Sequence, residues 1–254
     1  MCRTARLGWT IAAVVWLVGA GCGDDATTGS SIRVSAASSL RAAFTEIAGD
    51  FMDANPDVEV SLSFDSSTTL ATQLLEGAAA DVFASADEAN MARLTAEELV
   101  AGRPQPFARN QLVIVSKPGN PDGVASLADL ADAGVISLCG DAVPCGRYAA
   151  AALRQAGVTI PESRVTRGQN ATATLTAVTE GDAIAGVVYA SDAQAAGDAV
   201  EVVPIPATPN ALATYSIGEL STSARPSVAE AFVDHVLGDD GRRVLADHGF
   251  LPPS

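Results

Sequence analysis

Apolar and polar residues follow two different periods along this chain. In Val58–Phe64 they alternate strictly, which predicts a strand with one buried face. In Leu40–Phe51 the apolar residues return every three or four positions, which predicts a helix that buries one face. The same patterns predict further strands at 32–36, 81–84, 111–117, 135–138, 164–166 and 183–190, and helices at 69–76, around 126–131, and at 147–155, 172–180, 228–237 and 240–248.

This alternation of strands with short helices is typical of parallel α/β sheets joined by helical crossovers. The chain is long enough for two lobes of about a hundred residues, each with its own core. No repeat and no low-complexity linker follows residue 31, so we expect extended crossings between the lobes near Asn110–Leu112 and Tyr215–Glu219. The expected organisation is α/β, with one lobe at 32–110 plus 219–254 and a second at 111–218. Two such lobes close about a hinge and hold a ligand in the cleft between them.

The first segment carries a signal for export. Arg3 and Arg6 precede an uncharged run from Leu7 to Gly21, which ends at Cys22. This run is shorter than the about 20 residues of a membrane span, but it suits the core of a signal peptide. The alternative is a buried helix of the mature fold, which basic residues confined to the front of the run disfavour. We expect residues 1–22 to be the signal peptide and the small, polar residues 23–31 to be a flexible tether.

The four cysteines have different expected fates. The small residues 19–21 before Cys22 resemble the recognition box of bacterial lipoproteins, although residue 19 is a glycine where an aliphatic residue is usual. The resemblance implies that Cys22 carries a lipid and anchors an exported protein in the periplasm or at the cell surface. Cys139 and Cys145 are candidates for a disulfide in that oxidising compartment, with two free buried thiols as the alternative. As a metal site the pair is poor, because no His or further Cys lies nearby.

The chain is strongly acidic. Its formal net charge is −15, and removal of Arg3 and Arg6 with the signal peptide makes the remaining chain −17. Such a surface repels nucleic acid and gives no long-range attraction for an anionic ligand. We therefore expect no nucleic-acid partner, and any anion site has to act at short range.

Small or hydroxylic residues lie at three places where a strand ends and a helix begins. These places are Ala36–Ser39, Asp65–Thr69 and Val143–Gly146. The first backbone N–H groups of a helix have no partner within the helix, and the helix dipole is positive there. Small side chains allow a compact oxyanion to approach these donors, and Ser or Thr hydroxyls add further donors. Each Ser or Thr can equally be an ordinary helix cap.

Five segments resemble one family. They are AASSL (36–40), FDSSTTLATQLLEGAAADVFASAD (64–87), NQLVIV (110–115), VPCGRYA (143–149) and GVVYASDA (186–193), which have the order and spacing of the periplasmic molybdate-binding proteins. The resemblance runs from about Ile32 to Phe250. It implies a two-lobed periplasmic-binding-protein-like fold that captures molybdate or tungstate for an ABC importer, with the membrane permease as partner. It also implies a monomer with no cofactor and no enzymatic activity.

The resemblance also implies the residues that hold the ligand. In that family the oxyanion is bound by hydroxyl groups and backbone amides, without a charged side chain. By motif, Ser39 and Ser67 supply hydroxyl donors together with their own amides. Cys145 and Ala171 supply backbone N–H groups, and Tyr189 supplies its phenolic hydroxyl. Tyr189 can alternatively be a core residue of an apolar strand.

A site made only of donors suits an oxyanion that is fully deprotonated at neutral pH. Hydrogen phosphate carries a proton that would face another donor and leave both groups unsatisfied. Sulfate is also deprotonated and has to be excluded by its smaller size, whereas tungstate matches molybdate in size and charge. Asp65, beside these donors, is interpreted as a solvated or capping residue.

Two other functions stay open on the residues alone. One is a binding protein for sulfate, phosphate or an organic acid, and an organic acid would need an arginine clamp from Arg109, Arg147 or Arg167. The other is a hydrolase that uses Cys145, because the start of a helix lowers a thiol pKa. The two histidines of the chain, however, lie in the C-terminal helical region, and the sequence has no G-x-S-x-G, P-loop or H-E-x-x-H motif.

Overall fold

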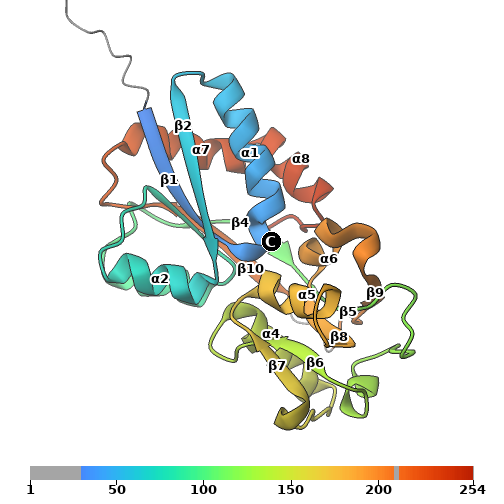
Figure 1. The fold of residues 1–254 in the computed structure, drawn as a ribbon. Coiled ribbons are helices and arrows are strands. Elements are labelled where there is room, and N and C mark those ends of the chain that lie inside the picture. Colours follow the sequence, from blue (N-terminus) through green and yellow to red (C-terminus); the bar gives the residue numbers. More distant parts are fainter. Residues whose placement is uncertain (1–29, 209–211, 254) are drawn as a thin grey trace, which may run out of the picture.

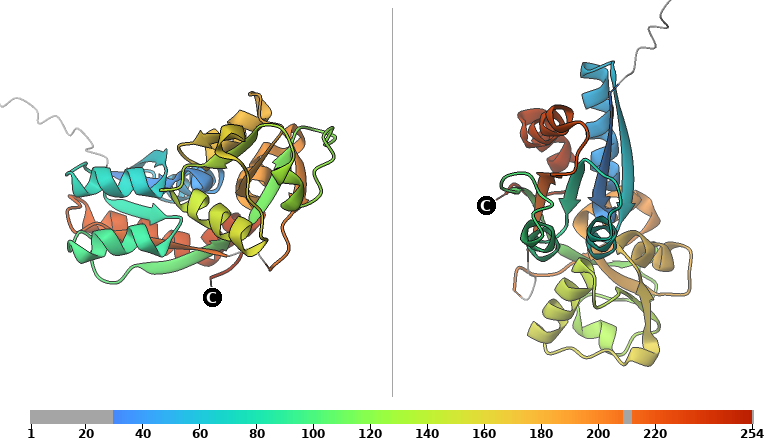
Figure 2. Two further views of the ribbon diagram at one scale, coloured as in Figure 1. Left: turned by 90° about the horizontal axis from the view of Figure 1, so that it is seen from below. Right: turned by 90° about the vertical axis from the view of Figure 1, so that its left-hand side faces the viewer.

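The computed structural model describes residues 30–208 and 212–253, which form two lobes (Figure 1). The expected signal peptide, Cys22 and most of the expected tether lie outside the described residues. The first strand begins at Ser30, so the last two residues of the expected tether belong to this strand. Each lobe contains a five-stranded sheet with helices packed on it (Figure 2).

The first lobe has the strand order β2-β1-β3-β10-β4. Its strands are β1 Ser30–Ala37, β2 Val58–Asp65, β3 Val82–Ser85, β4 Gln105–Asn110 and β10 Ala213–Glu219. Its helical elements are η1 Ser38–Leu40, α1 Arg41–Ala54, α2 Ser67–Leu75, α3 Glu88–Ala96, α7 Pro226–Leu237 and α8 Asp239–Asp247. β1 pairs in parallel with β2 and with β3, because α1 and α2 carry the chain back across the sheet after β1 and β2.

The second lobe has the strand order β7-β6-β8-β5-β9. Its strands are β5 Leu112–Ser116, β6 Ile136–Cys139, β7 Val165–Gly168, β8 Ala185–Tyr189 and β9 Glu201–Pro204. Its helical elements are η2 Ala128–Ala131, α4 Pro144–Gln155, η3 Glu162–Arg164, α5 Ala171–Thr179, α6 Ala190–Ala196 and η4 Gly197–Ala199. β6 pairs in parallel with β7 and with β8.

Both sheets are mixed, which corrects the prediction of purely parallel sheets. β10 runs antiparallel to β3 and β4, and β5 runs antiparallel to β8 and β9. In the first lobe the reason is the connection to the second: β4 leads the chain out and β10 leads it back, so the two strands run in opposite directions. The predicted two-lobed α/β class is confirmed.

The lobes are joined by two crossings. Gln111 alone separates β4 of the first sheet from β5 of the second, which places one crossing in the expected segment. The sequence predicts the other crossing at Tyr215–Glu219, but these residues pair with β3 and β4 inside the first sheet. The chain therefore returns to the first lobe before Ala213, and β10 belongs to the first lobe. An alternating strand pattern does not reveal which sheet the strand joins, which explains the difference.

Most predicted elements are present within a few residues of their expected ends. The helix predicted around 126–131 is only the short turn η2. The elements α3, α6, β4, β9 and β10 and the short turns η1, η3 and η4 are additional to those predicted. α1 buries its predicted face, and Phe44 and Phe51 pack edge-on against Phe232 of α7 with ring-centroid distances of 6.3 and 5.4 Å. Such pairs add about 1 kcal/mol each beyond the burial of apolar area. They fix α1, and with it the turn η1 that precedes it.

The described residues also lack two features. None of their helices combines the length and the apolar character that crossing a membrane requires. They contain no group of three or more His, Cys, Asp or Glu side chains arranged to hold a metal ion.

Candidate ligand-binding site between the lobes

The five predicted contact residues line one small cavity between the lobes. Ser39 and Ser67 come from the first lobe, and Cys145, Ala171 and Tyr189 come from the second. All five are buried. The cavity is small, about 200 Å³ with the space open to solvent included, and its further walls are Ala37, Ser38, Asp65, Ser66, Ala86, Pro144 and Asn170. A ligand in this cavity contacts both lobes at once, as expected for a cleft that closes about a hinge.

The starts of three helices and the turn η1 meet at this cavity. Ser39 lies in η1 directly after β1, and Ser67 is the first residue of α2. Cys145 is the second residue of α4, and Ala171 is the first residue of α5. The first N–H groups of a helix lack partners in the helix and carry partial positive charge. The cavity therefore offers hydrogen-bond donors to an anion at short range.

The neighbouring residues Ser66 and Ser67 have different tasks. Ser66 caps α2, because its Oγ accepts the backbone N–H of Thr69 at 3.0 Å. Ser67 Oγ instead accepts the backbone N–H of Ala86 at 2.9 Å. A backbone N–H can only donate, so the hydrogen of the Ser67 hydroxyl is not needed by Ala86. This hydrogen is available to an acceptor in the cavity that Ser67 lines.

Tyr189 supplies a buried hydroxyl to the same cavity. Its side chain is 1% exposed, and its Oη has no hydrogen-bond partner among the described residues. Burial raises the pKa of Tyr189, so the hydroxyl stays protonated and acts as a donor. An unsatisfied buried polar group costs about 1–3 kcal/mol. A ligand with an acceptor oxygen at this point removes that cost.

The backbone of Tyr189 is fixed by a buried carboxyl group. Tyr189 N donates to Asp192 Oδ2 at 3.3 Å, in the first turn of α6. Burial raises the pKa of Asp192 from 3.8 to about 7. Asp192 therefore holds the end of β8, on which the Tyr189 ring stands, and its charge changes near neutral pH.

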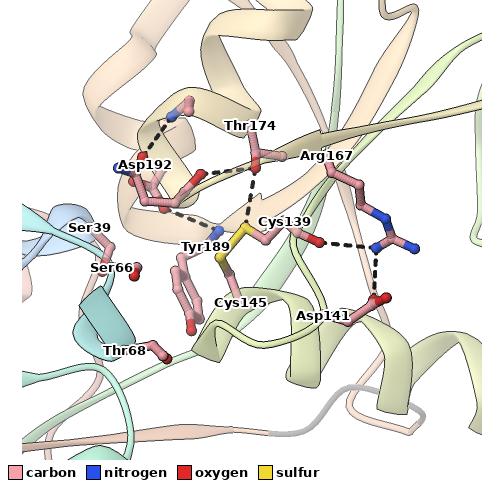
Figure 3. The surroundings of a disulfide bond; sticks show 12 residues. Ser39, Ser66, Thr68, Cys139, Asp141, Cys145, Arg167, Thr174, Tyr189 and Asp192 are labelled. Atoms are coloured by element: carbon pink, nitrogen blue, oxygen red, sulfur yellow. Dashed lines mark hydrogen bonds and ion pairs between the residues drawn. A yellow bond between two sulfur atoms is a disulfide. The ribbon is translucent and has the colours of Figure 1, made fainter. Parts of the chain in front are cut away.

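A disulfide supports the start of α4. Cys139 at the end of β6 and Cys145 in the first turn of α4 form this bond, which lies beside the Tyr189 ring (Figure 3). The next residue, Gly146, packs so tightly that a Cβ there would lie 2.0 Å from the Gly140 carbonyl oxygen, which explains the glycine. The bond restrains the backbone that carries the Cys145 N–H. It also leaves no free thiol for a hydrolase based on Cys145.

The comparisons with known proteins agree with this geometry. The sequence pattern of the bacterial extracellular solute-binding proteins matches residues 32–251. The chain belongs to this family. The molybdate-binding protein ModA of Mycobacterium tuberculosis H37Rv is 40% identical to it over 224 residues, which are 88% of this chain and 85% of that protein. This identity places the chain beside the molybdate-binding proteins within the family, whose members are exported.

Two solved structures show the same fold as this solute-binding protein. The periplasmic molybdate-binding protein of Azotobacter vinelandii matches with a TM-score of 0.80 and 21% identity, over 88% of this chain and 100% of that chain. The sulfate-binding protein SubI of Mycobacterium tuberculosis matches with a TM-score of 0.78 and 19% identity, over 88% and 87% of the two chains. These two proteins bind different oxyanions, so the fold alone does not identify the ligand.

The arginine clamp of the organic-acid alternative does not form in this solute-binding protein. Arg147 pairs with Asp87, Arg109 Nε donates to the chain at residue 252 at 2.8 Å, and Arg167 pairs with Glu162 at 2.8 Å. Within the described residues, no Arg, Lys or His lines the cavity. The cavity therefore lacks the bidentate cation that recognition of a carboxylate usually uses.

Polar contacts join the lobes around the cavity, and three of them involve Asp65, Thr68 and Arg147. Asp65 Oδ1 accepts the backbone N–H of residue 66 at 2.6 Å and Asn170 Nδ2 at 3.0 Å. Thr68 Oγ1 donates to the Ala142 carbonyl at 3.0 Å, and the ion pair of Arg147 is the third contact. Asp65 is thus the charged residue of the cavity wall, and its Oδ1 is occupied by two donors. These contacts favour the closed cleft.

The sequence reasoning missed three residues that support the donors. They are Ala86, whose N–H donates to Ser67 Oγ, Tyr215, whose hydroxyl hydrogen-bonds Ser39 Oγ, and Asn110, which lies near the Tyr215 hydroxyl. Tyr215 has a signal in the sequence, because a polar aromatic residue in an alternating strand usually needs a partner. Ala86 has none, since a backbone donor leaves no trace in the pattern of side chains.

Proposed function

We propose that this solute-binding protein captures molybdate and tungstate and delivers them to an ABC importer. The observation that carries the proposal is the hydroxyl of Tyr189, a buried donor without a partner among the described residues, in a cavity between the lobes. Ser39, Ser67 and the backbone N–H groups of Cys145 and Ala171 complete the set of donors. The name of the relative that is 40% identical supports the same ligand.

The chemistry of the cavity favours a small, fully deprotonated oxyanion. A dianion accepts from every donor at once, whereas hydrogen phosphate would turn its own proton towards one of them. Helix starts and hydroxyl groups supply local positive potential in a chain whose net charge is −15. Selection between molybdate and sulfate then depends on size, because a smaller ion does not reach the donors of both lobes together.

A role in binding rather than catalysis follows from the same residues. Cys145 is tied in a disulfide, and His235 and His248 do not line the cavity. The permease of the importer is the proposed partner, and it would contact a monomer at the rims of the two lobes. A lipid on Cys22 would hold the protein at the membrane, in the periplasm or at the cell surface.

Sulfate is the second candidate ligand. The fold matches a sulfate-binding protein almost as closely as a molybdate-binding protein, with TM-scores of 0.78 and 0.80. Sulfate is also fully deprotonated, so a set of donors does not exclude it. The size of the closed cavity has to make the distinction.

Isothermal titration calorimetry against molybdate, tungstate, sulfate and phosphate tests the proposal. We expect one-to-one binding of molybdate and tungstate, with sulfate and phosphate much weaker. A preference for sulfate would keep the transport function and replace the ligand. The absence of binding to all four anions would refute the oxyanion site.

A further inference from the structure

Each of the two serine hydroxyls of the cavity can point its hydrogen towards a ligand or away from it. A hydroxyl has one hydrogen and two lone pairs, so it can donate to an anion or turn its lone pairs towards it. Ser67 is directed by Ala86, whose N–H donates to Ser67 Oγ at 2.9 Å and cannot accept. Ser39 has no such backbone donor at its oxygen. Its Oγ lies 2.8 Å from the Tyr215 hydroxyl, a contact in which either oxygen can donate.

The direction of the Ser39–Tyr215 bond decides whether Ser39 can bind an anion. If Ser39 gave its hydrogen to Tyr215, an anion in the cavity would meet only the lone pairs of Ser39. If Tyr215 donates instead, the single hydrogen of Ser39 is free for the anion. Tyr215 is fully buried and is not part of the cavity wall, so it acts on a ligand only through Ser39.

The orientation of the Asn110 amide bears on this direction. Asn110 Oδ1 accepts the backbone N–H of Gln111 at 2.9 Å, which sets the orientation of the amide group. Its Nδ2 then faces the other way and donates to Ser191 Oγ at 2.8 Å. The same amide lies near the Tyr215 hydroxyl, where it opposes the rise that burial causes in the pKa of Tyr215.

The hydrogen of the Tyr215 hydroxyl therefore needs an acceptor other than Asn110. Asn110 Nδ2 can only donate and Asn110 Oδ1 accepts from Gln111, so this neighbour is a poor acceptor for the Tyr215 hydrogen. Burial keeps Tyr215 protonated, and a buried O–H without an acceptor is costly. Ser39 Oγ, at 2.8 Å, is an acceptor in reach. The Tyr215 hydrogen is thus directed at Ser39 Oγ, which leaves the Ser39 hydrogen for the cavity.

We propose that Tyr215 is a positioning residue that commits the Ser39 hydroxyl to donation and so helps the site to reject protonated oxyanions. The proposal rests on the proposed function of the cavity as an oxyanion site. With Tyr215 in place, Ser39 and Ser67 both point hydrogens at the ligand, and neither serine can accept the proton of hydrogen phosphate. Without the Tyr215 hydroxyl, Ser39 can rotate and accept that proton.

The variant Tyr215→Phe tests the proposal through two ratios of dissociation constants. The ratio of the phosphate to the molybdate dissociation constant measures the effect of the proton that hydrogen phosphate carries. The ratio of the sulfate to the molybdate dissociation constant is the control, because neither sulfate nor molybdate carries a proton. We expect the first ratio to fall about tenfold, the worth of one hydrogen bond, and the second to stay unchanged. Tyr148→Phe is the matched control, since it removes a tyrosine hydroxyl that does not line the cavity and should alter neither ratio.

Two unchanged ratios, or two ratios that change by the same factor, would overturn the proposal, because a purely structural defect weakens all anions alike. If the wild-type protein prefers sulfate to molybdate, the proposed ligand is wrong, and the Tyr215 proposal is tested with sulfate as the reference. If the wild-type protein binds no oxyanion, both proposals are wrong. Neutron diffraction from wild-type crystals is independent of how the variant folds: a hydrogen on Tyr215 Oη directed at Ser39 supports the proposal, and a Ser39 hydrogen directed at Tyr215 overturns it.

Discussion

Replacing Tyr189 by Phe should weaken ligand binding without weakening the protein itself. The substitution removes one hydroxyl and keeps the ring, which packs against the Tyr215 ring with centroids 5.9 Å apart. The hydroxyl has no hydrogen-bond partner among the described residues, so the substitution removes no hydrogen bond between these residues. We therefore expect the ligand-free variant to melt at the same temperature as the wild type or slightly above it.

The effect on binding follows from the charge of the ligand. A hydrogen bond to a charged group contributes about 1.5–3 kcal/mol, so the variant should bind molybdate about 10- to 150-fold more weakly. A ligand at a thousand times its dissociation constant stabilises a protein by about 4 kcal/mol, and each tenfold loss of affinity removes about 1.4 kcal/mol of this. For a chain of this size 1 kcal/mol corresponds to about 2–4 °C. The shift caused by molybdate should thus be about 3 °C or more smaller for Tyr189→Phe.

Differential scanning calorimetry with and without molybdate measures both quantities. Tyr148→Phe is the control, because it loses a tyrosine hydroxyl outside the cavity wall. An undiminished molybdate shift in Tyr189→Phe would refute the assignment of Tyr189 as a ligand donor. A lower melting temperature of the ligand-free variant would show that the hydroxyl has a structural partner instead.

Three further predictions concern the surroundings of the cavity. Burial raises the pKa of Asp192 from 3.8 to about 7, so the folded state binds more protons than the unfolded state between these values. Wild-type stability should therefore fall by about 3 kcal/mol from pH 4 to pH 7 because of this group. Asp192→Asn should remove that part of the slope in urea unfolding, and an unchanged slope would contradict the raised pKa. Replacing both Cys139 and Cys145 by Ala should lower stability by about 2 kcal/mol and make the unfolding midpoint insensitive to reductant, whereas equal stability would mean that the disulfide stabilises nothing. Arg147→Gln breaks an ion pair between the lobes and, because the arginine is 41% exposed, should speed molybdate release in stopped-flow chase experiments by only about fivefold. Arg243→Gln, which breaks surface ion pairs within α8, should leave the release rate unchanged. Equal release rates for both variants would show that the Arg147 ion pair does not hold the cleft closed.

The sequence was sufficient for the class of the fold and for the residues at strand ends. Ser39 and Ser67 follow β1 and β2 directly, so short-range patterns of strand, small residues and helix place them at the carboxyl edge of a sheet. The resemblance to the molybdate-binding proteins singled out the same serines, and the structure brings them together with Tyr189. Small and hydroxylic residues between a strand and a helix, repeated at several helix starts, are enough to predict where these serines lie.

The details that the sequence did not reveal depend on contacts between distant segments. β10 has the same alternating pattern whichever sheet it joins, so its place in the first lobe comes from pairing with β3 and β4. The partner of Ser39 is Tyr215, which lies 176 residues further along the chain. Ser67 is directed by a backbone N–H, which every residue except proline possesses. The direction of a hydroxyl is therefore a property of tertiary packing.

The central claim is that an oxyanion lies between the two lobes and is held by hydroxyl and backbone donors. A crystal structure grown with molybdate, with diffraction data collected on both sides of the molybdenum absorption edge, tests this claim most directly. We expect one anomalous peak in the cavity, with oxygens in hydrogen-bond reach of Ser39 Oγ, Ser67 Oγ and Tyr189 Oη. A peak elsewhere on the protein, or no peak at saturating molybdate, would contradict it.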